Sequence, residues 1–475
     1  MKSTACKKKL YAFRPDAEFV ETYRTRRRDR QEPCDPVSLE RGVRQLLSDK
    51  VSGNLVGLWL LIPEYLRLGI WDLLCGWTGR TSNTVQPRLA LQLVNEAALC
   101  VIGVRQSRTL SQKGFELANG LYFVASDSAI HDLLRVHSVG EAEALQVALG
   151  RIRRASGHYV GKLVAIDPHH LRSYTKRQTR RHRHKENEAA VKTIATFFCL
   201  DADSGEPVAF TIGTSARTAT QAAPGLLSLA DAILMPEKGK TTALADKEHC
   251  TVEMFNQAAQ RSSFDLLIPQ PSSQSLLRQL KGIPKEAFQS PWVGLAVATH
   301  PFHFSHGQGD YPLYQIVQRC GENHADYSFR SFLSTRHDNA LHSLIEDYPK
   351  RWHLEEFFNA NQALGWKRAG TLNLNIRYGH MTMALIAEAA IHQLRQRLNL
   401  PVAQWDAAHL AKDFFRGLEG DIRVADDTII VTYYNAPQAQ HLRPHYENLP
   451  EKLAKEKVQP PVPWLYNFKL DFRFR

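Results

Sequence analysis

The sequence predicts a mixed α/β protein whose α/β core is interrupted by a β-rich insertion and preceded by a helical domain. Three observations support this fold class. Apolar residues recur at helical spacing over residues 36–158, short apolar runs without polar alternation follow from residue 162, and strand-like patterns return over residues 272–345. With 475 residues, the chain is long enough for about three domains.

The helical domain includes two helices joined by a short turn, predicted over residues 127–134 and 141–154. The second helix ends in three basic residues, Arg151, Arg153 and Arg154. This pair suits either a DNA-reading helix-turn-helix or an ordinary helical hairpin. We expect residues 36–158 to form a helical DNA-binding domain that follows a basic arm, residues 1–35.

The core is predicted from the order of its strands and helices. Strands are expected over residues 162–167, 191–200, 207–211, 241–246 and 264–269, and helices over residues 218–235 and 251–261. This order, β-β-β-α-β-α-β, is the strand order of the ribonuclease H fold. We therefore expect a ribonuclease H-like core formed by residues 159–271 and 346–400, with an α+β tail over residues 401–475.

The formal net charge is +12, and the positive surplus is concentrated in two segments. Residues 1–30 hold ten Lys and Arg against four acidic residues, and residues 172–185 hold seven with no acidic residue. Such segments are typical of nucleic-acid contacts, and the alternative is a disordered tail with a solvated hairpin. The candidate phosphate contacts in the second segment are Lys176, Arg177, Arg180, Arg181, Arg183 and Lys185.

The cysteines and the apolar segments indicate the cellular compartment of the protein. The seven cysteines are widely spaced and include no Cys-x-x-Cys pair, so neither a disulfide framework nor a zinc ribbon is suggested. No apolar stretch follows the basic N-terminus as in a signal peptide, and charges and a proline interrupt the most apolar segment, residues 55–77. We expect a cytoplasmic protein without membrane contact.

Three carboxylates occupy positions that this fold would bring together. Asp167 is predicted to end the first core strand, Asp246 to end the fourth, and Glu355 to lie on the helix after the insertion. Oxygen ligands without Cys or His suit Mg²⁺ or Mn²⁺, and two such ions can promote an in-line displacement on a phosphate. Each carboxylate alone would also suit a capping position or, for Glu355, an ion pair with Arg351.

The helix that carries Glu355 has a polar stripe on one face. Residues about seven apart return to the same face, and the stripe consists of Tyr348, Arg351, Glu355, Asn359 and Gln362. A carboxylate beside an aromatic hydroxyl and a guanidinium suits a metal ion next to a phosphate. The alternative is an amphipathic surface helix.

With these residues the chain resembles the DDE-type transposases of bacterial insertion sequences, specifically the cut-and-paste group with a β-rich insertion before the last carboxylate. That group carries a Tyr-x2-Arg-x3-Glu-x6-Lys signature. This sequence has Tyr348, Arg351 and Glu355 at the same spacing, with Gln362 in place of the lysine. The resemblance covers about residues 160–400.

The resemblance implies roles for these residues. Asp167, Asp246 and Glu355 would bind two Mg²⁺ or Mn²⁺ ions. Tyr348 and Arg351 would contact the phosphate beside the scissile bond, and Gln362 would occupy the last phosphate-binding position of the signature without its charge.

The resemblance also implies a reaction and its partners. The protein would cleave double-stranded DNA at the terminal inverted repeats of an insertion sequence and transfer the 3′ ends to target DNA. It would act as a homodimer on paired ends in the bacterial cytoplasm, associated with the nucleoid. A catalytically impaired DNA-binding derivative, favoured by Gln362, and a metal-dependent nuclease that cuts without joining remain alternatives.

Two tryptophans need separate interpretation. In relatives the insertion supplies an aromatic residue that stacks on a displaced base, and Trp292 is the candidate here. The alternative for Trp292 is a buried core position, and Trp352 is also expected in the core.

Overall fold

The computed structural model describes residues 35–53, 55–81, 84–101, 110, 112–173, 181–182, 189–213, 217–337, 339–366, 371, 373–398, 402–437 and 439–475. The predicted basic arm, apart from its last residue, lies outside the described residues. So do five candidate phosphate contacts, Lys176, Arg177, Arg180, Arg183 and Lys185.

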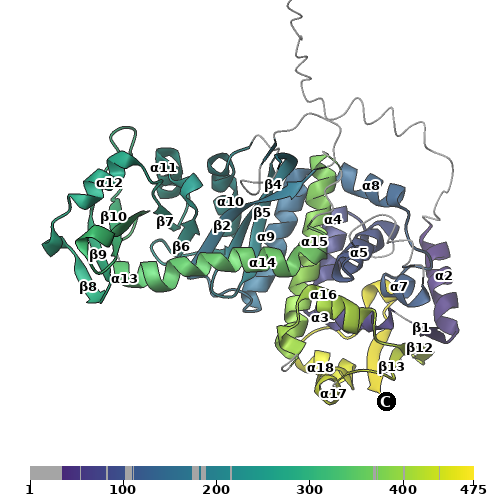
Figure 1. Ribbon diagram of the computed structural model, residues 1–475. Helices are drawn as coiled ribbons and strands as arrows, with labels where there is room; N and C mark the ends of the chain where they lie inside the picture. The colour runs from purple at the N-terminus through teal and green to yellow at the C-terminus, as the bar shows by residue number, and fades with distance from the viewer. Residues whose placement is uncertain are drawn as a thin grey trace, which may run out of the picture.

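The core is a mixed sheet with the predicted strand order (Figure 1). Across the sheet its strands are β5 (Glu206–Gly213), β4 (Val191–Asp201), β2 (Leu163–Arg172), β6 (Thr242–Ala245) and β7 (Asp265–Pro269). β4 pairs antiparallel with both β5 and β2, whereas β6 and β7 run parallel to β2. Helices α10 (Ala219–Leu234) and α11 (Val252–Arg261) make the crossovers. This arrangement confirms the ribonuclease H-like core.

The insertion extends the same sheet. Its strands are β8 (Gln289–Trp292), β9 (Leu295–Pro301), β10 (Tyr314–Cys320) and β11 (Ser328–Ser334), with α12 (Gln274–Lys281) before them. β11 pairs antiparallel with β7, and β10, β9 and β8 follow outward. The insertion is therefore continuous with the core through backbone hydrogen bonds.

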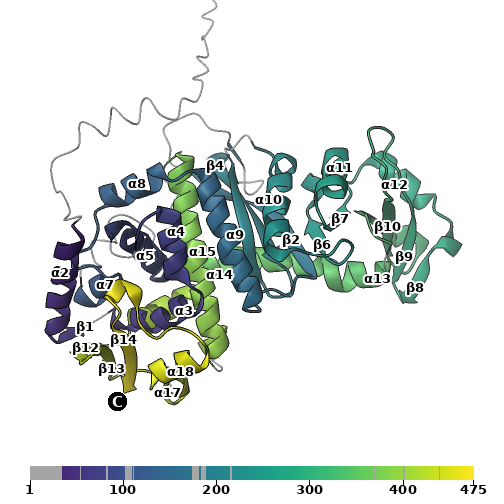
Figure 2. The same cartoon turned by 180° about the vertical axis from the view of Figure 1, so that it is seen from behind.

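Alternate residues of β2 enter two separate cores, as expected for a strand covered on both faces. Val164 and Ile166 pack with α10, whereas Leu163 and Ala165 join the cluster that includes α14 (His353–Asn361). Views from opposite sides show α14 crossing one face of the sheet and α10 covering the other (Figures 1 and 2).

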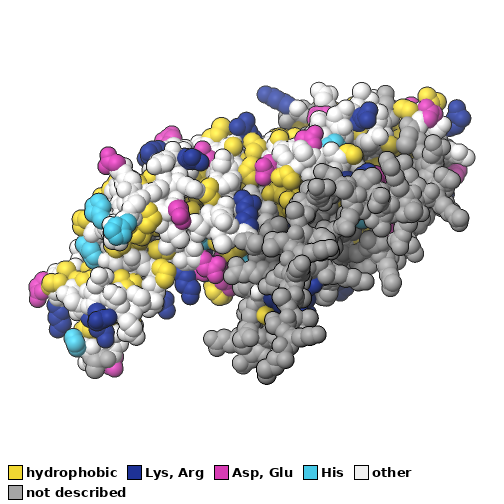
Figure 3. All heavy atoms as spheres, turned by 90° about the horizontal axis from the view of Figure 1, so that it is seen from above, with side chains coloured by type: hydrophobic (Ala, Val, Ile, Leu, Met, Phe, Trp, Pro, Cys, Tyr) yellow, Lys and Arg dark blue, Asp and Glu magenta, His cyan; other side chains and the backbone are white. Residues whose placement is uncertain are grey.

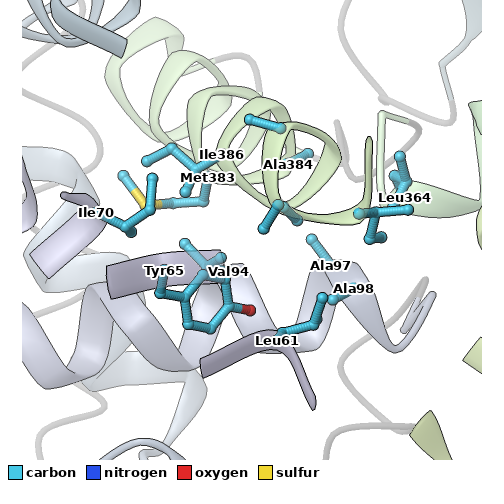
Figure 4. Packing of buried hydrophobic residues seen from close by; sticks show 14 of the residues in the cluster. Leu61, Tyr65, Ile70, Val94, Ala97, Ala98, Leu364, Met383, Ala384 and Ile386 are labelled. Atoms are coloured by element: carbon cyan, nitrogen blue, oxygen red, sulfur yellow. The ribbon is translucent and has the colours of Figure 1, made fainter. Parts of the chain in front are cut away.

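Helix α15 (Leu374–Arg397) joins the core to the N-terminal helices. It is buried along most of its length. Figure 4 shows Met383 and Ala384 of α15 facing Val94 and Ala97 of α5 (Val85–Ala98). Small side chains on both helices let their backbones approach closely, which extends one hydrophobic core from the sheet to the N-terminal helices.

The N-terminal helices and the C-terminal tail form one unit. A second sheet has the order β1 (Val51–Gly53), β12 (Gly420–Ala425), β13 (Thr428–Tyr433) and β14 (Lys469–Phe474). β1 pairs antiparallel with β12, so residues that the sequence analysis assigns to two separate segments share a backbone ladder.

The other described helices surround these two sheets. They are α2 (Pro36–Ser48), α3 (Ile62–Arg67), α4 (Ile70–Thr78), α7 (Lys113–Ala118), α8 (Asp127–Val136), α9 (Val139–Ala155), α13 (Ala340–His342), α16 (Ala407–Leu410), α17 (Ala439–Tyr446) and α18 (Leu449–Lys455). None of the described helices is long and apolar enough to cross a membrane.

Helix α9 packs on the rest of the fold along one side. It packs against α10, α15 and β5. At its C-terminal end Arg153 is fully buried, and the Arg151 side chain donates to the carbonyl of Ala232. Two of the three basic residues at this end of α9 therefore contact the fold, whereas Arg154 is exposed, and the helix-turn-helix interpretation stays a prediction.

Arg153 belongs to a buried ionic cluster centred on Glu206, at the start of β5. The carboxylate lies 2.5 Å from Arg153 and 2.6 Å from Nδ1 of His392 on α15. Burial alone would raise the pKa of Glu206. The hydrogen bond and charge of His392, with the charges of Arg153 and Arg395, outweigh burial and lower this pKa to about 2. The cluster thus ties α9, β5 and α15 together.

We expect Glu206→Gln to lower the free energy of unfolding by about 3 kcal/mol at neutral pH, because it leaves buried cations unpaired. The folded-state pKa lies below the ordinary 4.5. The stabilisation is therefore present above pH 4.5 and lost as the pH falls towards 2.

Urea unfolding of wild type and variant, at neutral pH and near pH 3, measures both effects. The exposed Glu356→Gln is the control. An equal difference at both pH values would contradict the assigned role of the Glu206 charge.

Candidate active site

The pairing of β2 with β6 places two of the predicted carboxylates side by side. The parallel ladder ends with Ile166 opposite Ala245, and Asp167 and Asp246 are the next residues. Adjacent strands lie about 4.8 Å apart, so the two side chains start from neighbouring positions. β6 ends here, where the Asp246 carboxylate accepts a hydrogen bond from the backbone amide of Lys247.

Asp167 does not end its own strand, contrary to the prediction. β2 continues to Arg172 because β4 pairs with it as far as Thr193. Residues 168–170 are polar or proline, so the second half of β2 does not form an apolar run in the sequence. Asp167 is therefore in mid-strand towards β4, but stands beside the end of β6 on the other side.

The third carboxylate lies on a helical run that changes its hydrogen-bonding pattern. α13 (Ala340–His342) passes into a π-helical turn (Ser343–Asp347), a 3₁₀ turn (Tyr348–Trp352), α14 and a second 3₁₀ turn (Gln362–Leu364). The predicted helix is present but is not a regular α-helix throughout. Such irregular turns recur at functional sites.

Several contacts hold α14 across the sheet. Lys350 forms a 2.6 Å ion pair with Asp203, and Nδ1 of His353 donates a 2.6 Å hydrogen bond to the carbonyl of Ala202. Phe357 on the apolar side of the helix is buried, as the pattern predicts. These contacts direct the polar stripe towards Asp167.

Arg351 lies between two of the carboxylates. Its guanidinium is 3.5 Å from Asp167 and 3.8 Å from Glu355. The hydroxyl of Tyr348 donates a 3.4 Å hydrogen bond to the carbonyl of Ala245, the last residue of β6. Residues far apart in the sequence therefore meet at one edge of the sheet.

Burial raises the pKa of the Asp167 carboxyl to about 7. The charge of Arg351 lowers this pKa, whereas the charges of Asp246 and Glu355 raise it further. The carboxylates are thus close enough to repel one another, and Arg351 compensates only in part. A carboxylate with such a pKa is typical of a functional site.

The three carboxylates fit a divalent cation in their chemistry. They offer oxygen ligands and crowded negative charge, which a hard cation such as Mg²⁺ would relieve. Among the described residues, no three His, Cys, Asp or Glu side chains converge closely enough to form a metal site. In this arrangement Arg351 lies between Asp167 and Glu355.

The remaining predicted residues differ in their positions. Arg181 lies on β3 (Arg181–His182), which pairs with β4, and it lines a cavity away from the carboxylates. The side chain of Gln362 lies outside the described part of the chain, so its phosphate contact stays a prediction. Trp292 and Trp352 are 52% and 57% exposed, so the core positions considered for them are wrong.

Two histidines near the site were not predicted from the sequence. His353 anchors the start of α14, and its place two residues before Glu355 was the available signal. His249 is buried just after Asp246, where its backbone amide donates to the Asp246 carbonyl. Burial lowers the pKa of His249 to about 4, so it is neutral at physiological pH.

Three comparisons show which known proteins the chain is similar to. Residues 158–389 match the family described as the transposase DDE domain. Among solved structures, the chain is similar to a piggyBac transposase in a synaptic complex with hairpin DNA. That likeness has 11% sequence identity and a TM-score of 0.40, and covers 78% of this chain and 82% of the other. No curated protein sequence matches the chain.

We expect Asp167→Asn to stabilise the fold by roughly 2–4 kcal/mol above pH 7 in EDTA, because a pKa shift of one unit corresponds to about 1.4 kcal/mol. The folded-state pKa of about 7 lies above the ordinary 3.8. The wild type should therefore lose stability relative to the variant as the pH rises from 3.8 through 7.

Urea unfolding as a function of pH measures this difference. Asp203→Asn is the matched control, because it removes a carboxylate that is paired with Lys350 and should not stabilise. A less stable Asp167→Asn variant would show that the charged form of this carboxylate is not unfavourable in the folded protein.

Proposed function

We propose that the chain, whose residues 158–389 match the transposase DDE domain family, is a transposase that cleaves the terminal inverted repeats of an insertion sequence. It would then transfer the 3′ ends to target DNA. The observation that carries the proposal is that Asp167 and Asp246 follow the last paired residues of β2 and β6, with Arg351 lying 3.5 Å from Asp167 and 3.8 Å from Glu355.

These three carboxylates would hold two Mg²⁺ or Mn²⁺ ions. Bound ions would activate the attacking oxygen and stabilise the leaving oxygen of a phosphodiester. The protein residues position the DNA. Arg351 would exchange its carboxylate contacts for the phosphate beside the scissile bond, because a guanidinium binds phosphate through two parallel hydrogen bonds. Tyr348 would contact the same phosphate.

Other parts of the chain would contact DNA further from the cut. The basic arm and the segment 172–185 would bind phosphates. Trp292 lies at the end of β8 in the insertion with half of its surface exposed, which supports the proposal that it stacks on a displaced base. We propose a homodimer on paired ends, as the resemblance implies.

Two alternatives share the same site. Gln362, in place of the signature lysine, favours a DNA-binding derivative with impaired catalysis. A nuclease that cuts without joining would use the same carboxylates. Strand-transfer products from pre-cut ends would exclude the nuclease.

We expect the protein to cut a linear duplex bearing the ends that flank its gene, in Mg²⁺ or Mn²⁺ but not in EDTA. Asp167→Ala, Asp246→Ala and Glu355→Ala should each abolish cutting while leaving DNA binding largely intact, since affinity comes mainly from Lys and Arg. Gel analysis of the products measures the cutting.

The control for the cleavage assay is Glu356→Ala, the neighbouring exposed carboxylate on α14. It should cut like the wild type. Specific binding of the ends without cutting in either metal would favour the impaired derivative. Wild-type cutting by any one triad variant would remove that residue from the site.

We expect Arg351→Gln to bind Mn²⁺ severalfold more tightly than the wild type without DNA, because the variant lacks a cation that competes for Asp167 and Glu355. The same variant should cut DNA poorly. Isothermal titration with Mn²⁺ measures the affinity. Arg278→Gln, which removes an exposed arginine on α12, should leave it unchanged. Equal Mn²⁺ affinity in wild type and Arg351→Gln would show that the guanidinium does not compete with the ion.

A further inference from the structure

A cavity of about 1030 Å³ lies on the face of the sheet opposite the carboxylates. Successive side chains of a strand point to opposite faces. On β2, His169 stacks on Phe358 of α14, with ring centroids 4.3 Å apart. Pro168 and His170 line the cavity instead. The cavity and the Asp167 carboxylate thus lie on opposite sides of one strand.

The lining of the cavity has separate cationic and anionic parts. Arg181 on β3 and Arg217 before α10 supply positive charge, whereas Glu248 and Glu253 supply negative charge near and on α11. Neither arginine pairs with a carboxylate in the described part of the chain. Arg217 instead donates to the backbone carbonyls of Ile212 and Gln221.

Seen from above, Lys and Arg side chains of the described residues are interspersed with acidic ones and do not gather in one patch (Figure 3). The start of α10 adds little to the cavity, because the side chains of Thr218 and Gln221 already cap it. The positive charge of its lining therefore comes from Arg181 and Arg217.

The end of β6 connects the two faces of the sheet. β6 pairs with β2 only as far as Ile166, and none of the described strands pairs with β2 on that side beyond this residue. Glu248, in the turn after Asp246, lines the cavity, and its charge also raises the pKa of Asp167. A chain passing the end of β6 would reach both sites.

We propose that this cavity binds a single strand of DNA, with its phosphates on Arg181 and Arg217 and its bases turned towards Glu253. A duplex would bring phosphates against the acidic side as well, where Glu248 and Glu253 would repel them. A single strand can direct its phosphates to one side and its bases to the other. This inference rests on the proposed function, because the strand would come from DNA bound at the carboxylates.

The rest of the lining suits bases. The ring of Phe197 and the side chain of Pro168 line the cavity and offer flat apolar surfaces on which a base can stack. Carboxylates accept hydrogen bonds from the amino group of cytosine, which thymine lacks. The cavity should therefore prefer cytosine to thymine where the base meets Glu253.

The test measures binding of fluorescein-labelled oligo(dC), oligo(dT) and a duplex of the same length to the full chain in EDTA, by fluorescence anisotropy. Arg181→Ala should weaken binding of both single strands severalfold and reduce the salt slope by about 0.7, one phosphate contact on a single strand. Duplex binding should weaken less, because the basic arm and the rest of the segment 172–185 would still bind its phosphates. The control is Arg278→Ala, an exposed arginine on α12 that should change none of these values.

The Glu253→Ala variant distinguishes a carboxylate that faces the bases from one that only repels DNA. If bases face this carboxylate, the variant loses affinity for oligo(dC) relative to oligo(dT). If Glu253 only repels DNA, the variant binds both oligonucleotides more tightly and by the same factor, which would overturn the proposal. Equal loss of duplex and single-strand binding in Arg181→Ala would also overturn it.

Photocrosslinking locates the strand independently of affinity. Oligo(dT) containing 4-thiothymidine should crosslink to peptides from β4, the start of α10 or α11, and crosslinks elsewhere alone would contradict the proposal. These assays contain no metal and measure no cutting. Binding in the cavity without cleavage of DNA ends would count against the proposed function alone.

Discussion

The parallel pairing of β2 with β6 is the constraint on which the candidate site depends. The two strands stop pairing after Ile166 and Ala245, so the next residue of each is an aspartate at the same edge. β2 then continues beside β4 alone. One register therefore brings Asp167 and Asp246 together and leaves the end of β6 open to both faces of the sheet.

The candidate site holds carboxylates close together, and their mutual repulsion lowers the stability of the fold. Asp167 is largely buried, and Asp246 and Glu355 add to the cost of its charge. Arg351 relieves that cost in part from a position between Asp167 and Glu355. The anchoring of α14 by Lys350 and His353 maintains the arrangement, because both bind the turn between β4 and β5. This arrangement of charges therefore lowers the stability of the fold at the place where a cation and a phosphate are proposed to bind.

The long helix α15 connects the N-terminal helices to the core sheet, whose edge carries the candidate site. Its apolar length packs on α5 (Figure 4), and His392 and Arg395 reach Glu206 at the start of β5. Arg153 on α9 meets the same carboxylate. A helix predicted to read DNA is thereby fixed to the sheet, because a buried guanidinium needs a buried partner.

Local periodicity and residue type were enough to predict the order of the core strands, and they single out the three carboxylates and the polar stripe of the helix at Tyr348 as candidate site residues. The same local patterns misjudged the length of β2, since only pairing with β4 extends a strand through residues 168–170. Tertiary structure alone decided that Trp292 and Trp352 are exposed, that Arg153 is buried and that β1 joins β12. It also decided that Arg351 lies between the carboxylates and that a cavity lies behind Asp167. These features come from contacts between residues far apart in the sequence, which no local pattern records.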